Sequence, residues 1–174
     1  MKKQPLLWPD AIFSSFAEVS AACLRARGVR ALLCDIANTL VTYDDAEPTE
    51  AVRAWLDALR AGGITVGFLS NNENARVERF NQSLGLYAKA KAGKPARRAA
   101  LQFLQSTGFP PQQTALLGDQ IFTDVLCARL CGLQSFLVPP IKDKKTPFFR
   151  AKRFLERPFL HAFRTRRNKS NKSK

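Results

Sequence analysis

Short apolar runs alternate with amphipathic stretches along this chain, and this alternation limits the possible folds more than any other feature of the sequence. Four strand-like runs occupy residues 30–35, 65–70, 114–118 and 134–138. Helical patterns lie at residues 49–61, 73–84, 95–106 and 122–131. Strands that alternate with helices predict a parallel sheet covered on both faces and joined by right-handed crossovers. We therefore predict an α/β fold, with a weak fifth strand near residues 86–88.

The length of 174 residues suits one domain with its own core. No apolar run is long enough to cross a bilayer, and the N-terminus lacks the apolar segment and cleavage site of a secretory signal. The predicted organisation is a helical lead-in, an α/β core, a basic aromatic helix and a disordered tail, at residues 1–29, 30–141, 142–167 and 168–174 respectively.

The net charge of the chain is concentrated near its C-terminal end. Residues 142–174 contain 13 Lys and Arg against 2 Asp and Glu, a balance of +11. Residues 1–141 contain 15 against 12, so they contribute only +3 of the total of +14. A segment of this composition predicts a polyanionic partner.

Cysteine and histidine offer this chain little catalytic chemistry. The four cysteines lack CxxC or disulfide-framework spacing, so we expect buried free thiols in a reducing cytosol. The single histidine, His161, lies in the basic segment. One histidine supports neither a histidine-rich zinc site nor a Ser-His-Asp triad, and the chemistry must therefore depend on carboxylates.

Polar side chains gather where the predicted strands end. Asp35 ends the first strand, Ser70 the second, and Asp119 follows the strand at residues 114–118, while Lys94 precedes a helical pattern. Ligands of open α/β sheets collect at the carboxyl ends of the strands. We therefore expect these four side chains to converge on one rim.

The chemistry of these residues is that of phosphoryl transfer. A carboxylate such as Asp35 attacks phosphorus and forms an acyl-phosphate. Asp35 and Asp119 together need a cation, and Mg²⁺ prefers oxygen ligands. Lys94 and Ser70 would hold the phosphoryl oxygens, and Asp124 would order the outer shell of the metal.

Each of these residues has a simpler interpretation when taken alone. Asp35, Ser70 and Asp119 suit helix caps, and a lysine such as Lys94 is often merely solvated. Their joint occurrence at strand ends favours the catalytic interpretation. The two interpretations are also compatible, because anions bind at helix N-termini.

Four segments in this order resemble the motifs of the haloacid dehalogenase (HAD) superfamily. They are DIANTL at residues 35–40, SNN at 70–72, KP at 94–95 and GDQIFTD at 118–124. Within that superfamily the chain is most similar to the YqeG-type phosphatases of subfamily IIIA, which are phosphatidylglycerophosphate phosphatase-like. The N-terminal LLWPD at residues 6–10 and the aromatic, basic C-terminus also resemble that family, so the likeness covers nearly the whole chain.

The resemblance implies a fold and a set of functional residues. The fold would be a HAD-like Rossmannoid three-layer sandwich with a parallel sheet of about five strands and no cap domain. Catalysis would rest on Asp35, Ser70 and Lys94, and substrate binding on Asn38, Thr39 and Asn71. The Mg²⁺ cofactor would be held by Asp35, the backbone carbonyl of Ala37 and Asp119, with Asp124 in the outer shell.

Position 37 departs from the family pattern, because the second Asp of the first motif is Ala37 here. In typical members that Asp protonates the leaving oxygen and activates water. General acid–base catalysis of this kind increases the rate ~10²–10⁴-fold. We therefore expect Mg²⁺ and phosphate binding with weakened turnover. Asp44 and Asp45 on the following loop are candidate substitutes, although solvated turn residues are the simpler interpretation. Alanine at this position also resembles the phosphonatase branch, but the connections are too short for the cap domain of that branch.

The absence of a cap and the basic tail together suggest a substrate. An open site suits a phosphate presented by something large, and the resemblance points to phosphatidylglycerophosphate. Between Phe148 and Phe163 five Phe and two Leu are interleaved with Arg and Lys, which is typical of a helix on an anionic membrane. The same pattern fits aromatics packed on the domain, and less well a nucleic-acid contact.

The sequence thus predicts a Mg²⁺-dependent phosphomonoesterase that is cytoplasmic and peripherally membrane-associated. Its partners would be a phosphorylated lipid head group, or another large phosphomonoester, and the anionic membrane surface. The alternative is a catalytically impaired HAD domain that acts as a membrane- or RNA-binding regulatory module.

Overall fold

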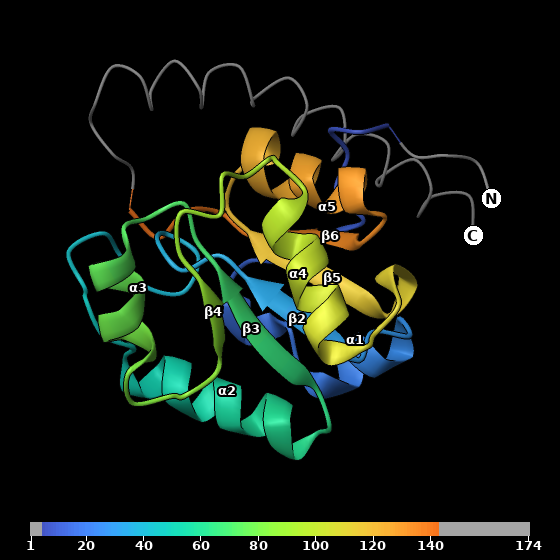
Figure 1. Ribbon diagram of the computed structural model, residues 1–174. Helices are drawn as coiled ribbons and strands as arrows, with labels where there is room; N and C mark the ends of the chain where they lie inside the picture. Colours follow the sequence, from blue (N-terminus) through green and yellow to red (C-terminus); the bar gives the residue numbers. More distant parts are fainter. Residues whose placement is uncertain (1–4, 143–174) are drawn as a thin grey trace.

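A single parallel sheet forms the centre of the protein in a computed structural model, which describes residues 5–142. Six strands lie in the order β1-β6-β5-β2-β3-β4, and every neighbouring pair is parallel (Figure 1). They are β1 (Ala11–Ile12), β2 (Ala31–Cys34), β3 (Thr65–Leu69), β4 (Tyr87–Lys89), β5 (Thr114–Gly118) and β6 (Gln134–Leu137).

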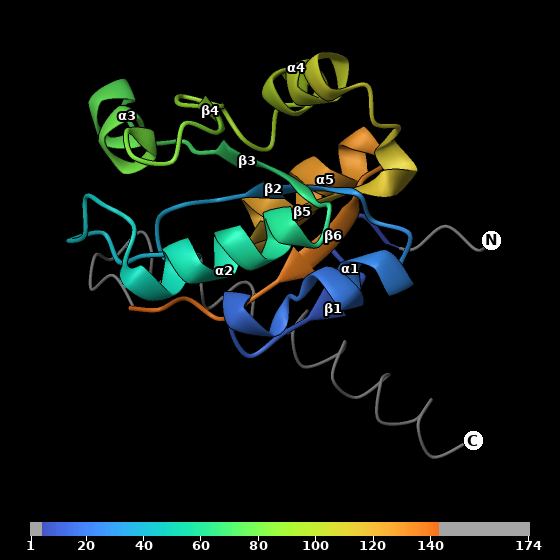
Figure 2. The ribbon, with the colours of Figure 1, turned by 90° about the horizontal axis from the view of Figure 1, so that it is seen from below.

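Helices cover both faces of this sheet. They are α1 (Ala21–Ala26), α2 (Glu50–Ala61), α3 (Asn74–Asn81), α4 (Arg98–Thr107) and α5 (Leu126–Cys131). Buried residues of α1, α2 and α3 form one core cluster with the strands, and those of α4 and α5 form a second. Figure 2 shows α1 and α2 on one side of the sheet and α4 on the other. The result is a three-layer α/β sandwich, as predicted.

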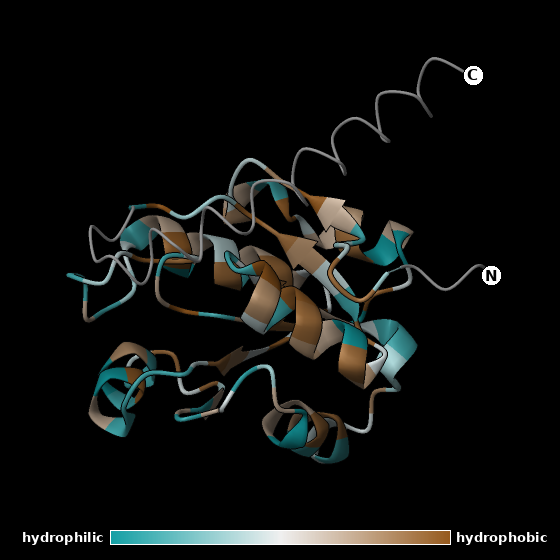
Figure 3. Ribbon diagram, turned by 90° about the horizontal axis from the view of Figure 1, so that it is seen from above, coloured by the Kyte–Doolittle hydropathy of each residue, from teal (hydrophilic) through white to brown (hydrophobic). Residues whose placement is uncertain are grey.

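The sequence of α2 shows why these helices form and how they pack. The Thr49 hydroxyl accepts a hydrogen bond from the Val52 N–H (3.3 Å), which caps the first turn. The apolar positions 52, 55, 56 and 59 share one face, and all four side chains are buried. In Figure 3 the hydrophobic colouring lies on the strands and on the helix surfaces that face them.

Three local differences separate the structure from the sequence prediction. The strand β1, at the sheet edge, lies in the lead-in that was expected to be helical, so the sheet has six strands rather than about five. The helix expected from Pro95 begins at Arg98, after a cis Lys94–Pro95 peptide bond. The helix expected from Phe122 starts instead as a π-helical turn (Ile121–Val125) that continues into α5.

The remaining sequence predictions about domain organisation have different outcomes. Within residues 5–142 the connections hold only short loops, turns and helices, and no cap domain is inserted. None of the helices in that range has the length and apolarity needed to span a membrane. The helix expected at residues 142–167 and the tail expected at 168–174 lie outside the described residues, apart from Lys142.

Candidate active site

The three central strands bring the motif residues together at one edge of the sheet. Cys34 at the end of β2 is level with Phe68 of β3 and Leu117 of β5. Asp35, Ser70 and Asp119 therefore follow neighbouring strands at the same carboxyl edge, as the sequence predicts. All three residues are buried, with exposed fractions of 6%, 0% and 1%.

Lys94 enters this group from the loop between β4 and α4. Its Nζ lies 2.7 Å from Asp35 Oδ1 and 2.7 Å from Asp124 Oδ1. Burial lowers the pKa of Lys94, but the carboxylates of Asp124 and Asp35 outweigh that effect, so its pKa is raised. The ammonium group is therefore kept charged between two carboxylates in the interior.

Burial also changes the proton affinity of Asp35. Burial and the charge of Asp124 raise the pKa of this carboxyl and Lys94 lowers it, so that together these effects raise it to about 6. The Thr39 hydroxyl donates a hydrogen bond to Asp35 Oδ2 at 3.5 Å. The carboxylate oxygens of Asp35 thus face both the lysine and the hydroxyl of the neighbouring loop.

Three carboxylates meet at this point, which favours a cation. Oxygen atoms of Asp35, Asp119 and Asp124 all lie within 4.8 Å of one another. Lys94 balances only part of three buried negative charges, and a hard divalent cation with oxygen ligands suits such a donor set. The residues present therefore fit the Mg²⁺ expected from the sequence.

Gly118 allows Asp124 to reach this cluster. A Cβ atom at position 118 would collide with the side chain of Asp124, so only glycine leaves the space that the carboxylate occupies. The Gln120 N–H donates to Asp124 Oδ2 at 3.1 Å. The sequence analysis expects Asp124 in the outer shell of the metal, and in the structure its carboxylate lies beside those of Asp35 and Asp119.

The side chains of two asparagines that the resemblance assigns to substrate binding form hydrogen bonds with backbone groups. Asn71 Nδ2 donates to the Lys94 carbonyl (3.1 Å), and the Lys94 N–H donates to Asn71 Oδ1 (2.8 Å). Asn38 makes the same pair of bonds with the peptide groups of Lys142, at 2.7 and 3.2 Å. The sequence did not reveal either contact, since both depend on residues distant along the chain.

The loop of residues 35–40, the DIANTL loop, is tightly folded at position 37. The N–H groups of Leu40 and Val41 both donate to the Ile36 carbonyl, and Ala37 forms a parallel bridge with Val41. Ala37 is 3% exposed. An aspartate at position 37, as in the family pattern, would therefore stand on a buried turn whose backbone is held by hydrogen bonds.

The two aspartates considered as substitutes have other partners. Residues 42–48, the flap loop, follow the DIANTL loop. There Asp45 Oδ2 accepts hydrogen bonds from the Thr42 N–H and hydroxyl, which lower the pKa of Asp45. Asp44 Oδ2 is paired with Lys142 Nζ at 2.6 Å. A general acid needs a raised pKa, so the environment of Asp45 does not suit that role.

Arg76 of α3 is a further residue of this region that the sequence did not single out. Its Nη2 donates to the carbonyls of Thr42 and Asp45, at 2.9 and 2.8 Å, and its Nη1 donates to the carbonyl of Tyr43 at 2.7 Å. A single arginine on a rigid helix thereby holds three peptide groups of the flap loop. The sequence gives no signal for this role, because a charged residue on an amphipathic helix is ordinarily solvated.

Comparisons with known proteins agree with the sequence motifs. A family model described as HAD-hydrolase-like matches residues 91–146. The chain is 30% identical over 156 residues to a probable phosphatase, YqeG of Bacillus subtilis (strain 168), and the match covers 90% of this chain and 91% of that protein.

The fold is similar to those of two solved structures. One is the cobalt-bound deoxy-D-mannose-octulosonate 8-phosphate phosphatase from Haemophilus influenzae, with a TM-score of 0.54, 16% identity, and coverage of 74% of this chain and 77% of that chain. The other is a putative HAD superfamily (subfamily III A) hydrolase from Legionella pneumophila, with a TM-score of 0.50, 19% identity, and coverage of 74% and 73%. At these identities the likeness concerns the fold.

Proposed function

Because the chain belongs to the HAD superfamily and to the family of the YqeG phosphatase, we propose that it hydrolyses a phosphomonoester of a membrane lipid through a phospho-aspartate on Asp35. The observation that carries this proposal is the buried cluster at the strand ends, in which Lys94 lies between Asp35 and Asp124 with Asp119 beside them. A nucleophile, a fixed positive charge and a cation site thus meet at one point.

The chemistry follows from the positions of these groups. A carboxylate oxygen of Asp35 attacks phosphorus, the bond to the ester oxygen breaks, and the phosphoryl group is carried by Asp35 until water releases it as phosphate. Lys94 Nζ, 2.7 Å from Asp35, neutralises charge on the phosphoryl oxygens, and the buried Ser70 hydroxyl donates to them. Thr39 orients the Asp35 carboxylate.

Mg²⁺ would be held by Asp35, Asp119 and the Ala37 carbonyl, and Asp124 would support it from within the same carboxylate group. The bound metal would offset the negative charge of the transferring phosphoryl group. We expect the Asp119→Asn variant to lose the rise in melting temperature that millimolar Mg²⁺ gives the unaltered protein. Differential scanning fluorimetry measures this shift, with Asp57→Asn on the exposed face of α2 as the control. A full shift in the Asp119 variant would remove that residue from the metal site.

Ala37 should weaken turnover in a specific way. No carboxyl group is available at position 37 to protonate the leaving oxygen or activate water, and Asp44 and Asp45 are engaged elsewhere. We expect Ala37→Asp to raise turnover ~10²–10⁴-fold. A Mg²⁺-dependent phosphate-release assay on both forms tests this, together with the lifetime of the phospho-aspartate, which should be longer in the unaltered protein. Equal rates and lifetimes in both forms would show that position 37 has no acid–base role.

The lipid substrate is supported by the open site and by the charge of the C-terminal segment. Within the described residues no cap domain covers the cluster, so a head group that protrudes from a surface can enter. The segment from Lys142 onward carries +11, which favours a cytoplasmic protein held peripherally on an anionic membrane. Vesicles that contain phosphatidylglycerophosphate supply the direct test, since release of phosphate from them requires both binding and chemistry.

Ala37 also favours a second function, that of a weakened HAD domain serving as a membrane- or RNA-binding regulatory module. This alternative predicts Mg²⁺ and phosphate binding with no measurable hydrolysis of vesicle-borne phosphate. It also predicts that Ala37→Asp creates activity that the unaltered protein lacks. The same two assays therefore separate the two functions.

A further inference from the structure

After β6 the chain crosses the carboxyl edge of the sheet and reaches the DIANTL loop (Figure 1). The Val138 N–H donates to the Gly118 carbonyl at 3.0 Å, and the Ile141 N–H donates to the Asn38 carbonyl at 3.1 Å. Asn38 Nδ2 donates to the Lys142 carbonyl at 2.7 Å, and the Lys142 N–H donates to Asn38 Oδ1 at 3.2 Å. Residues 138–142, the closing segment, therefore hold both the backbone and the side chain of Asn38.

Asn38 is also held from within its own loop. Its N–H donates to the Val41 carbonyl at 2.7 Å, so its two backbone groups and both ends of its side-chain amide are hydrogen-bonded to the protein. Its backbone has a φ of 67°, a conformation that asparagine adopts more readily than most residues, and it is 2% exposed. Asn38 is thus a fixed point of the DIANTL loop.

The peptide group that joins Ala37 to Asn38 takes its direction from this fixed point. In a trans peptide the N–H and the C=O lie in one plane and point in opposite directions. Because the Asn38 N–H faces Val41, the Ala37 carbonyl faces away from Val41. Ala37 is 3% exposed, and no hydrogen bond within residues 5–142 is accepted by its carbonyl. Buried carbonyls are rarely left without a partner, and a hard cation is a partner that suits this oxygen.

We propose that Asn38 is a positioning residue of the metal site, through which the closing segment fixes the Ala37 carbonyl as a ligand of Mg²⁺. This inference rests on the proposed function, in which that carbonyl binds the metal together with Asp35 and Asp119. Without the closing segment, the bond to Val41 alone would hold the peptide plane, and the carbonyl could turn away from the metal. Groups that orient metal ligands from behind typically change the metal affinity 10–100-fold when they are removed.

Two variants release Asn38 by routes that share no substitution. Asn38→Gly tolerates the positive φ and keeps the backbone N–H and carbonyl, but it removes both side-chain bonds. Lys142→Pro removes the N–H that donates to Asn38 Oδ1 and leaves the DIANTL loop unaltered. Either variant alone tests the inference if the other does not fold.

Two control variants separate this role from general stability. Lys142→Ala keeps the peptide groups that bond Asn38 and loses only the contact of Lys142 Nζ with Asp44, which is exposed at both side chains. Asn81→Ala removes a matching pair of bonds, because Asn81 Nδ2 donates to the Leu86 carbonyl at 2.6 Å and the Leu86 N–H donates to Asn81 Oδ1 at 3.1 Å. That pair lies in the turn between α3 and β4.

The measured quantity is the dissociation constant of Mg²⁺ for the full chain without substrate, determined by isothermal titration calorimetry. We expect it to rise roughly 10–100-fold in Asn38→Gly and to rise in Lys142→Pro as well. Lys142→Ala and Asn81→Ala should keep the dissociation constant of the unaltered protein. Where binding is too weak for calorimetry, the rise in melting temperature across a Mg²⁺ series gives the same constant.

The outcomes separate this inference from the proposed function. An unchanged dissociation constant in both Asn38→Gly and Lys142→Pro overturns the role of Asn38, and loss of binding in Asp119→Asn then leaves the metal site itself standing. Equal weakening in Asn81→Ala also overturns it, because the affinity would then follow stability rather than the position of Asn38. If the unaltered protein binds no Mg²⁺, the metal site of the proposed function is rejected and this inference with it.

Discussion

Lys94 is buried and is held both at its side chain and at its backbone. Its ammonium group lies between Asp35 and Asp124, and its peptide groups are bonded by the side chain of Asn71. A charged side chain with 2% exposure has little freedom to find a phosphate by itself, so its backbone must be placed accurately. Asn71 is therefore a positioning residue for Lys94.

We expect Asn71→Ala to reduce kcat about tenfold or more, because a small displacement of Lys94 weakens the neutralisation of the phosphoryl group. Asn81→Ala is the matched control, since it removes the same two types of bond far from the site. Both variants should lose roughly 1–3 kcal/mol of unfolding free energy. Steady-state kinetics and urea unfolding measure the two effects, and an equal loss of kcat in both variants would contradict the role of Asn71.

The sequence predicts part of this residue-scale arrangement. Asp35, Ser70, Lys94 and Asp119 are brought together as expected, because residues that follow neighbouring parallel strands must share an edge. The partners of Asn38 and Asn71 were not predictable. A side chain that bonds backbone groups elsewhere leaves no pattern in its own neighbourhood, and Lys142 lies 104 positions from Asn38.

At the scale of elements, the long periodic segments were predictable and the short ones were not. Strands β2, β3, β5 and β6 lie within one or two residues of the predicted runs, since each is a continuous apolar run. The two residues of β1 are too few to show a period. The π-helical turn before α5 differs from an α-helix in its backbone hydrogen bonds, such as that from the Val125 N–H to the Gln120 carbonyl (3.2 Å), and the spacing of apolar residues does not reveal such bonds.

Helix α3 has a task beyond covering the sheet, because Arg76 holds the flap loop. We expect Arg76→Gln to speed backbone hydrogen exchange in residues 42–45, since it removes charged donors to three carbonyls. Exchange followed by mass spectrometry measures this. Arg79→Gln, one turn along α3, should leave exchange nearly unchanged because its contact with Glu47 is exposed. Equal protection of the flap loop in the Arg76 variant would show that the loop holds itself.

At the scale of the whole molecule, charge divides the chain into a nearly neutral folded part and a strongly basic segment. Residues 1–141 carry +3 and the remainder +11. Near an anionic surface each basic residue contributes about 1 kcal/mol, and the Debye length falls from ~10 Å at 0.1 M salt to ~3 Å at 1 M. Membrane binding should therefore be governed by the segment after Lys142 and weaken with salt.

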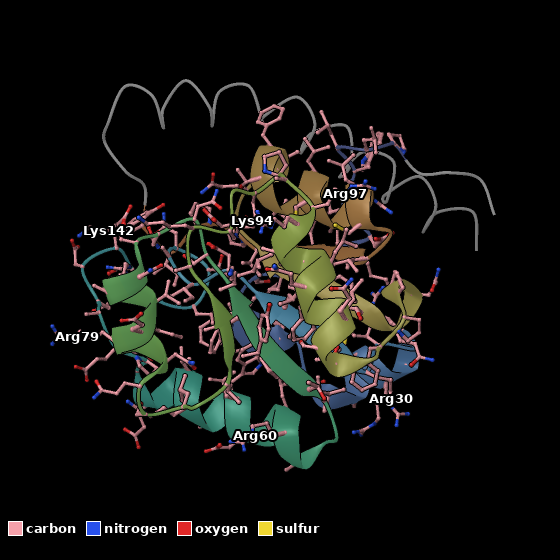
Figure 4. All side chains as sticks on the ribbon, viewed as in Figure 1. Arg30, Arg60, Arg79, Lys94, Arg97 and Lys142 are labelled. Carbon is pink, nitrogen blue, oxygen red and sulfur yellow. The ribbon has the colours of Figure 1, made fainter. Side chains whose placement is uncertain are left out.

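We expect the protein to co-sediment with phosphatidylglycerol vesicles at low salt, much less at high salt, and little with phosphatidylcholine vesicles. Replacing Arg150 and Arg153 with Gln should weaken binding roughly tenfold or more. Replacing Arg30 and Arg60 with Gln removes the same charge from the described fold, on the side away from Lys142 (Figure 4), and should have little effect. Equal losses in the two double variants would assign binding to net charge alone.

The order of strands in the sheet also bears on how the chain is completed during synthesis. The first strand, β1, pairs with β6, the last, in the register Ala11 to Phe136 and Ile12 to Leu137. Asp10 and Ser135, 125 positions apart, exchange hydrogen bonds beside that pair. The first strand made on the ribosome, β1, therefore has no strand to pair with until the last strand, β6, has been made. A nascent chain that ends before residue 134 already contains every proposed catalytic side chain, yet the edge of its sheet is still unpaired.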